Sequence, residues 1–285
     1  MEVGSGKGQF LRALVGDPAN SNVGIGFDPS HEGPLEDLDG RLKFHRSYYG
    51  PEWSGLKADV VVSRHVIEHV PSPTALLQSV RAALNSSPHA RVFFETPCVE
   101  WILRRRVVWD FFYEHCSLFS PASIRSAFET SGLRVDAVRH VFNEQYLWVE
   151  ASVSSELLNV RYEAGSIPRL AREFAEAESS LTEGWRRRLS AATASGPVAI
   201  WGAGAKGATF ANLVDPNREL IQCVIDLNPR KQGRYIGGTG HPIVDYGEIR
   251  SRGIRTVLMM NPNYLDECRE LLKQAEIRAD LVSAE

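Results

Sequence analysis

Residues 2–8 read EVGSGKG, so three glycines stand at positions 4, 6 and 8 in the spacing GxGxG. A glycine-rich turn between a strand and a helix lets backbone N–H groups approach a ligand closely. The apolar run 22–28, NVGIGFD, is a predicted strand that ends in Asp28, 20 residues after Gly8. An acid there can accept hydrogen bonds from both hydroxyls of a ribose. This stretch therefore predicts an α/β sheet with a nucleotide-type site at its edge.

The glycine spacing narrows the expected cofactor. Dinucleotide sites use GxGxxG, whereas GxGxG with an acid two residues ahead of it is the form seen in S-adenosylmethionine sites. The strand 58–63, ADVVVS, also ends in polar residues, and carboxyl ends of parallel strands meet in one crevice. The predicted cofactor-binding residues are Glu2, Gly4, Gly6, Gly8, Asp28, Ser63, Arg64 and His65.

Two further polar residues, Glu68 and His69, are expected in the same crevice. His65 and His69 stand four residues apart with Glu68 between them, which is a spacing that metal sites also use. We find no third ligand at zinc-like spacing and predict no metal. His69 can equally begin a helix.

Composition excludes several classes of protein. The chain has 285 residues, 43% hydrophobic and 24% charged, and a net charge of −3. Nothing in this balance indicates nucleic acid or a membrane surface as a partner. We see no signal peptide and no apolar run that could span a bilayer, and we expect a cytoplasmic protein with a small-molecule substrate. The four cysteines form no CxxC pair and are expected to be buried or half-buried apolar residues.

Strands and helices alternate along the chain, which predicts a mostly parallel α/β sheet. Residues 153–195 break the alternation with a long charged helical pattern, whose arginines 186–188 we expect to face solvent. At 196 the strand–loop–helix pattern restarts. We predict an S-adenosylmethionine-binding domain over 1–152, a helical connector over 153–195 and a smaller Rossmann-like domain over 196–285.

The second domain opens on a glycine loop of its own. Gly202, Gly204 and Gly207 form a full GxGxxG after the strand PVAIW, and Asp226 follows Gly207 by 19 residues. By spacing this is the better NAD fingerprint. An alternative reading is therefore an NAD-dependent oxidoreductase or another enzyme that modifies sugar nucleotides. We find no YxxxK-type catalytic pair near this loop.

Several longer strings, taken in order, resemble one known family. EVGSGKGQFL, GIGFDPS, SRHVIEHVPSP, FFETP, WDFFYEHCSLFSPASI and FNEQYLWVEA are similar to class I S-adenosylmethionine-dependent C-methyltransferases, above all those that methylate carbon 3 of nucleotide-linked keto-deoxysugars. IWGAGAKG, VIDLNPRKQGRYIGGTGHPI and LMMNPNY resemble the C-terminal domain of that group.

The resemblance implies a mechanism. Methylation next to a ketone needs a base, donors for the developing oxyanion and a dry, aligned cavity. The family's Tyr-Glu-His motif falls on Tyr113, Glu114 and His115, with His115 as the implied general base. From the residues alone, a histidine after aromatic residues is more often a packed structural residue. Three further residues are predicted to bind substrate, although loop packing or exposure would explain each: Tyr48, Asn143 and Lys206.

The chain differs from this family at its N-terminal end. Members usually carry a cysteine-based zinc module and a helix before the first strand, and here only MEV precedes Gly4. We expect a shortened form or an internal start, with neighbours of the central strand left partly unpaired. A second alternative is therefore an inactive, shortened paralogue that binds ligand without turnover.

Overall fold

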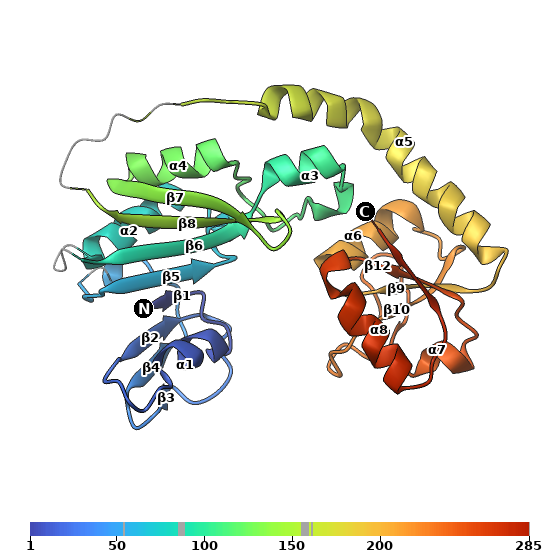
Figure 1. Ribbon diagram of the computed structural model, residues 1–285, viewed down its shortest axis with the longest axis horizontal. Coiled ribbons are helices and arrows are strands. Elements are labelled where there is room, and N and C mark those ends of the chain that lie inside the picture. The colour runs from blue at the N-terminus through green and yellow to red at the C-terminus, as the bar shows by residue number, and fades with distance from the viewer. Residues whose placement is uncertain (54, 85–88, 155–159, 161, 285) are drawn as a thin grey trace. The chain divides into compact units, whose positions relative to one another are not determined.

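The computed structural model describes all residues except 54, 85–88, 155–159, 161 and 285. The chain forms two compact units, each with its own sheet (Figure 1). The first unit comprises residues 1–101 and 114–167, and the second comprises 102–113 and 168–285. Within the described residues, no helix is both long and apolar enough to cross a bilayer.

The first unit holds an eight-stranded sheet in the order β3-β4-β2-β1-β5-β6-β8-β7. The five central strands β4, β2, β1, β5 and β6 run parallel to one another. At the edges, β3 pairs antiparallel with β4, β8 pairs antiparallel with β6, and β7 pairs antiparallel with β8. In chain order the strands are β1 (Glu2–Val3), β2 (Gly24–Phe27), β3 (Glu36–Asp37), β4 (Leu42–His45), β5 (Val60–Arg64), β6 (Arg91–Pro97), β7 (Leu133–Val141) and β8 (Tyr146–Val153).

Four α-helices lie in the first half of the chain: α1 (Gln9–Val15), α2 (Pro73–Leu84), α3 (Val99–Arg105) and α4 (Pro121–Thr130). Helix α4 begins with a capping box, because the Ser120 hydroxyl accepts from the Ser123 N–H and the Ser123 hydroxyl accepts from the Ser120 N–H. This capping box satisfies two backbone donors that the first turn would otherwise leave unpaired. Short 3₁₀ turns cover 51–53, 67–69 and 108–110.

The central strand β1 is short but pairs on both sides. Glu2 and Val3 lie opposite β2 and β5, and Val62 N–H donates to the Met1 carbonyl at 2.9 Å. The first residue of β5, Val60, is 41% exposed. The carboxyl end of β1, from which the glycine loop leaves, is fully paired with both neighbours.

The second unit holds a five-stranded, fully parallel sheet in the order β11-β10-β9-β12-β13. Its strands are β9 (Val198–Trp201), β10 (Ile221–Ile225), β11 (Ile243–Val244), β12 (Thr256–Met259) and β13 (Asp280–Ser283). Its helices are α5 (Ile167–Thr193), α6 (Ala205–Val214), α7 (Glu248–Ser251) and α8 (Leu265–Gln274), with a 3₁₀ turn over 262–264. This arrangement matches the predicted Rossmann-like pattern.

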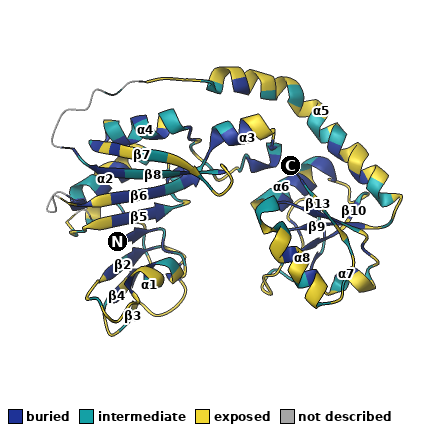
Figure 2. Cartoon of the chain, in the orientation of Figure 1, coloured by how far each residue is buried: buried dark blue, intermediate teal, exposed yellow. Residues whose placement is uncertain are grey.

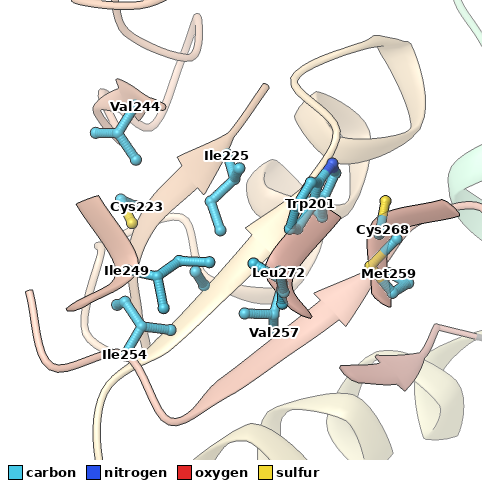
Figure 3. Packing of buried hydrophobic residues seen from close by; sticks show 11 residues of the cluster. Trp201, Cys223, Ile225, Val244, Ile249, Ile254, Val257, Met259, Cys268 and Leu272 are labelled. Atoms are coloured by element: carbon cyan, nitrogen blue, oxygen red, sulfur yellow. The ribbon is translucent and has the colours of Figure 1, made fainter. Parts of the chain in front are cut away.

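The core of the second unit is built from strands that are buried on both faces (Figure 2). Side chains of β9, β10 and β12 pack with those of α7 and α8 (Figure 3). Cys223 and Cys268 belong to this core, and Cys98 is buried in the first unit, as expected. Cys116 is the exception, because it is exposed.

Helix α5 packs through its apolar stripe. Leu170, Trp185 and Leu189 are buried, as the helical spacing predicts. Arg186, expected to face solvent only, donates to the Val214 carbonyl at 2.9 Å at the end of α6. A guanidinium at this position satisfies carbonyls that the last turn leaves without intrahelical partners.

Candidate active site

The first glycine loop requires glycine at all three positions. Gly4, Gly6 and Gly8 have φ of 79°, 51° and 76°, in the left-handed region that side chains disfavour. A Cβ on Gly4 would lie 2.1 Å from a methyl carbon of Val66, and one on Gly8 would lie 2.5 Å from the Phe44 ring. A Cβ on Gly6 would meet no atom within 4 Å, so the space over the middle of the loop is open.

Asp28 faces this loop from the end of β2. Its Oδ2 accepts from the Gly6 N–H at 2.8 Å, and its Oδ1 accepts from the N–H and hydroxyl of Ser30. Each carboxylate oxygen has two lone pairs, so Oδ2 keeps capacity for a ligand hydroxyl. The loop and the acid therefore form a preorganised cradle of the kind that receives a nucleoside.

Glu2 and Arg64 are predicted cofactor contacts, and the structure pairs them with each other. Glu2 is only 2% exposed, and burial raises its pKa while the Arg64 guanidinium 3.6 Å away opposes that rise. The guanidinium also stacks on Phe10 at 3.9 Å from the ring centroid. Ser63 is buried, and its hydroxyl has no hydrogen-bond partner among the residues that the structure describes.

His65 lies between two carboxylates. Its Nε2 is 3.0 Å from Glu95 and its Nδ1 is 3.5 Å from Glu68. Burial disfavours the charged imidazole, but Glu68 and Glu95 outweigh burial and raise the pKa of His65 to about 9. His65 therefore carries a positive charge at neutral pH. Its φ of 54° is left-handed, a conformation costing of order 1–3 kcal/mol that typically persists at functional sites.

His115 lies beside His69 and Glu68. The rings of His69 and His115 meet edge to face at 4.8 Å, and His69 Nδ1 is 3.1 Å from the Glu114 carbonyl. Burial lowers the pKa of His115, and the neighbouring His69 and His65 add to that effect against the opposing carboxylates of Glu68 and Glu114. His115 is therefore neutral at pH 7, as a proton acceptor must be.

Glu68 is the most buried member of this group. It is 1% exposed, and its Oε2 accepts from the Thr96 hydroxyl at 3.0 Å. One donor atom each from Glu68, His69 and His115 lie within 4.8 Å of one another. Tetrahedral zinc, with metal–ligand bonds of ~2.0–2.2 Å, needs donor atoms roughly 3.5 Å apart. We assign no metal to this group, and the expectation of no metal stays a prediction.

The other predicted site residues lie in more open positions. Tyr113 is fully exposed and belongs to the second unit, whereas Glu114 contributes its carbonyl to His69. Tyr48 is 77% exposed, and Asn143 is exposed in the β7–β8 turn. Lys206 lies in the second unit, 2.8 Å from the buried carboxylate of Asp110. Their proposed contacts with substrate remain predictions.

Sequence reasoning missed three residues of this group: Glu95, Thr96 and Tyr146. Glu95 and Thr96 end β6 directly beside β5, and Tyr146 meets His65 edge to face at 4.6 Å. The signal for the first two was present in the string FFETP, because polar residues at the carboxyl end of a parallel strand reach the crevice. Tyr146 reaches it through antiparallel pairing of β8 with β6, which no local pattern predicts.

Two family models match different parts of the chain. Residues 1–138 match the family model of a methyltransferase domain, and residues 161–281 match that of a C-methyltransferase C-terminal domain. C-methyltransferase NovU of Streptomyces niveus is 28% identical over 199 residues, which is 65% of this chain and 47% of NovU. The matched part of the chain thus spans about half the length of this relative.

Solved structures give more distant likenesses. A putative methyltransferase in complex with the Haloferax volcanii Trm112 activator has a TM-score of 0.42 and 16% identity, with 54% of this chain and 81% of that one covered. The dimethyltransferase RosA of Streptomyces davawensis has a TM-score of 0.40 and 19% identity, with coverage of 54% and 48%.

The first unit has the fold of the class I S-adenosylmethionine-dependent methyltransferases, with a mixed sheet and a glycine loop after its central strand. The cradle of Gly4, Gly6 and Asp28 fits the cofactor of that class. The second match, over residues 161–281, is to the C-terminal domain found in C-methyltransferases.

Proposed function

We propose that the chain is a C-methyltransferase that methylates the carbon next to the ketone of a nucleotide-linked 4-keto-deoxysugar through an enolate. Support for methylation at carbon comes from the match over 161–281 and from the likeness to NovU. Support for a keto-sugar acceptor comes from the resemblance of the FFYEHCSLFS and C-terminal strings to enzymes that act on such substrates.

The observation that carries the proposal is that His65 lies between the carboxylates of Glu68 and Glu95, while the half-buried His115 packs against His69. His115 is held neutral by burial, whereas Glu68 and Glu95 hold His65 protonated. Active sites separate the pKa values of neighbouring groups in this way when one group accepts a proton and another stabilises charge.

Each residue then has a role in the reaction. Bound S-adenosylmethionine supplies an electrophilic methyl group. His115 accepts the proton from the carbon next to the ketone, and the electron pair of that C–H bond moves into an enolate. The new imidazolium is stabilised by the buried carboxylate of Glu68. The loop of Gly4, Gly6 and Gly8 with Asp28 holds the cofactor so that the enolate carbon can attack in line.

The test separates proton removal from methyl transfer. The chain is incubated in D₂O with S-adenosylhomocysteine and a nucleotide-linked 4-keto-deoxysugar, and NMR follows exchange at the carbon next to the ketone. Methyl transfer is measured separately with labelled S-adenosylmethionine. We expect His115→Ala to slow both reactions by about 10²–10⁴-fold without changing the calorimetric affinity for S-adenosylhomocysteine.

The matched control is His89→Ala, which removes an exposed histidine just before β6, at the opposite end of that strand from Glu95. It should leave both rates unchanged. Near-normal exchange in His115→Ala would remove His115 as the base. Binding of S-adenosylhomocysteine without exchange or transfer on any keto-sugar would overturn the acceptor class and favour the inactive paralogue.

A further inference from the structure

The second unit contains a cavity that the proposed reaction does not use. It has a volume of about 490 Å³, within the usual range for small-molecule sites of roughly 300–1,000 Å³. It opens where β9, β10 and β12 end, and its lining includes Gly202, Gly204, Lys206, Asp226, Met260 and Tyr264. Every lining residue belongs to the second unit.

The cavity occupies the topological switch point of its sheet. The chain passes from β9 to β10 and β11 on one side, then crosses to β12 and β13 on the other. Helices that follow strands on opposite sides of such a point leave a crevice, and open α/β sheets bind ligands there. The cavity spans this crevice from Asp226 at the end of β10 to Met260 after β12.

The glycine loop beside the cavity is held as the loop of the first unit is held. Gly202 N–H donates to the Ile225 carbonyl at 2.7 Å, and Asp226 Oδ2 accepts from Ala203 N–H at 2.9 Å. Asn228 N–H donates to Asp226 Oδ1 at 2.8 Å. The corresponding bonds in the first unit join Gly4 to Phe27, Gly6 to Asp28, and Ser30 to Asp28, at 2.8 Å each.

The second loop differs from the first in the spacing of its third glycine. A Cβ on Gly207 would lie 1.9 Å from the Gly202 carbonyl oxygen, so α6 packs directly against the loop. This close packing is the role of the third glycine in GxGxxG. A Cβ on Gly204 would meet nothing within 4 Å, so the backbone there is open to a ligand.

The cavity wall offers one cation for a diphosphate and two carboxylates for ribose hydroxyls: Lys206, Asp226 and Glu267. Lys206, in the first turn of α6, lines the cavity and is held by Asp110. Gly204 is the N-cap of this ten-residue helix and provides no side-chain cap, which leaves N–H groups available for an anion. Asp226 Oδ2 also pairs with Lys231 Nζ at 3.2 Å, whereas Oδ1 accepts from Asn228 N–H and retains capacity for a hydroxyl.

We propose that this cavity binds a dinucleotide with an unsubstituted ribose. The ribose hydroxyls donate to Asp226, the diphosphate lies over Gly204 and Lys206, and the second nucleoside fills the crevice next to Met260 and Tyr264. The site is separate from the S-adenosylmethionine cradle and does not depend on the methyl-transfer proposal.

The test is calorimetric titration of the full chain with NAD⁺ while saturating S-adenosylhomocysteine occupies the first cradle. We expect one NAD⁺ per chain, and NADP⁺ at least tenfold weaker, because a 2′-phosphate cannot donate to Asp226 as the 2′-hydroxyl does and Lys231 is already paired with that carboxylate. Failure of NAD⁺ to bind to chain that binds S-adenosylhomocysteine would overturn the proposal, as would equal or tighter binding of NADP⁺.

Two variants with matched controls locate the site. Gly204→Val adds a side chain into open space, since its φ of −88° suits any residue, and should weaken NAD⁺ binding at least tenfold. Gly237→Val makes the same change away from the cavity, also where a Cβ meets no atom, and should have no effect. Unchanged affinity in Gly204→Val would overturn the proposal.

Asp226→Asn should likewise weaken the binding of NAD⁺ at least tenfold and leave the affinity for S-adenosylhomocysteine unchanged. Asp28→Asn, titrated with each ligand alone, should show the reverse pattern. Loss of NAD⁺ binding in Asp28→Asn would place NAD⁺ in the first cradle and refute a second site.

Discussion

The charge on His65 depends on two carboxylates, and removal of one is the most direct test of the site's electrostatics. Glu95→Gln keeps the side-chain size but removes the negative charge 3.0 Å from His65 Nε2. Glu68 then remains as the single carboxylate against the burial that lowers the pKa of this histidine. We expect the pKa of His65 to fall from about 9 toward its ordinary value of ~6.5.

The raised pKa also makes folding stability depend on pH. The folded and unfolded pKa values of His65 differ by about 2.5, which without solvent screening would correspond to about 3.4 kcal/mol of folding stability. Because the His65 side chain is 41% exposed, solvent screening reduces this to roughly 1–2 kcal/mol. A raised folded pKa means that this stability is fully present below pH ~6.5 and is lost as pH rises through about 9.

The assay is histidine NMR titration together with urea unfolding at pH 6.5 and 9.5. The wild-type chain should lose about 1–2 kcal/mol more between these pH values than Glu95→Gln. Glu150→Gln is the control, since Glu150 pairs with Arg139 on β7 instead of with a histidine. A His65 pKa that stays near 9 in Glu95→Gln would refute the proposed charge arrangement.

Three other perturbations have clear expected outcomes. Gly4→Ala should destabilise folding by about 1–3 kcal/mol in urea unfolding, because it adds a clash to a left-handed backbone, whereas Gly6→Ala should cost about 1 kcal/mol; equal costs would contradict the predicted clash with Val66. In native protein at pH 8, Cys116 should be alkylated first and Cys223 spared, since burial raises the pKa of Cys223 to about 11; mass spectrometry decides the order. Phe210→Ala should cost about 3–5 kcal/mol, because that ring is fully buried; a cost below 1 kcal/mol would show that the site collapses.

Local patterns were sufficient to predict most elements of the two sheets. The strands predicted at 22–28 and 58–63 are present within a few residues of these bounds. Their signals are local, because continuous apolar runs and capping residues act over single elements. β7 was not predicted, although it pairs along most of β8 and closes that edge of the sheet.

The candidate site was predictable only in part, because its key contacts join distant segments. The loop glycines and Asp28 act within one strand–helix–strand unit, and their arrangement followed from spacing. The contact of His69 with His115 joins residues 46 positions apart, and the role of Glu95 depends on the register of β5 against β6. Neither is encoded in a short string, so the opposing pKa shifts of the two histidines required the structure.

The aromatic cluster of Trp109, Trp185 and Phe210 in the second unit affects how the protein can be divided and in what order it folds during synthesis. Trp109 packs edge to face against Trp185 and Phe210, although it is encoded ahead of α4 and the last two strands of the first unit. A fragment cut anywhere between 153 and 195 would carry Phe210 without this partner and would present an apolar face to water. An exchange of the two units as consecutive segments would therefore separate Trp109 from Trp185 and Phe210. A ribosome would release the first unit's last strand before the second unit could bury the tryptophan translated earlier.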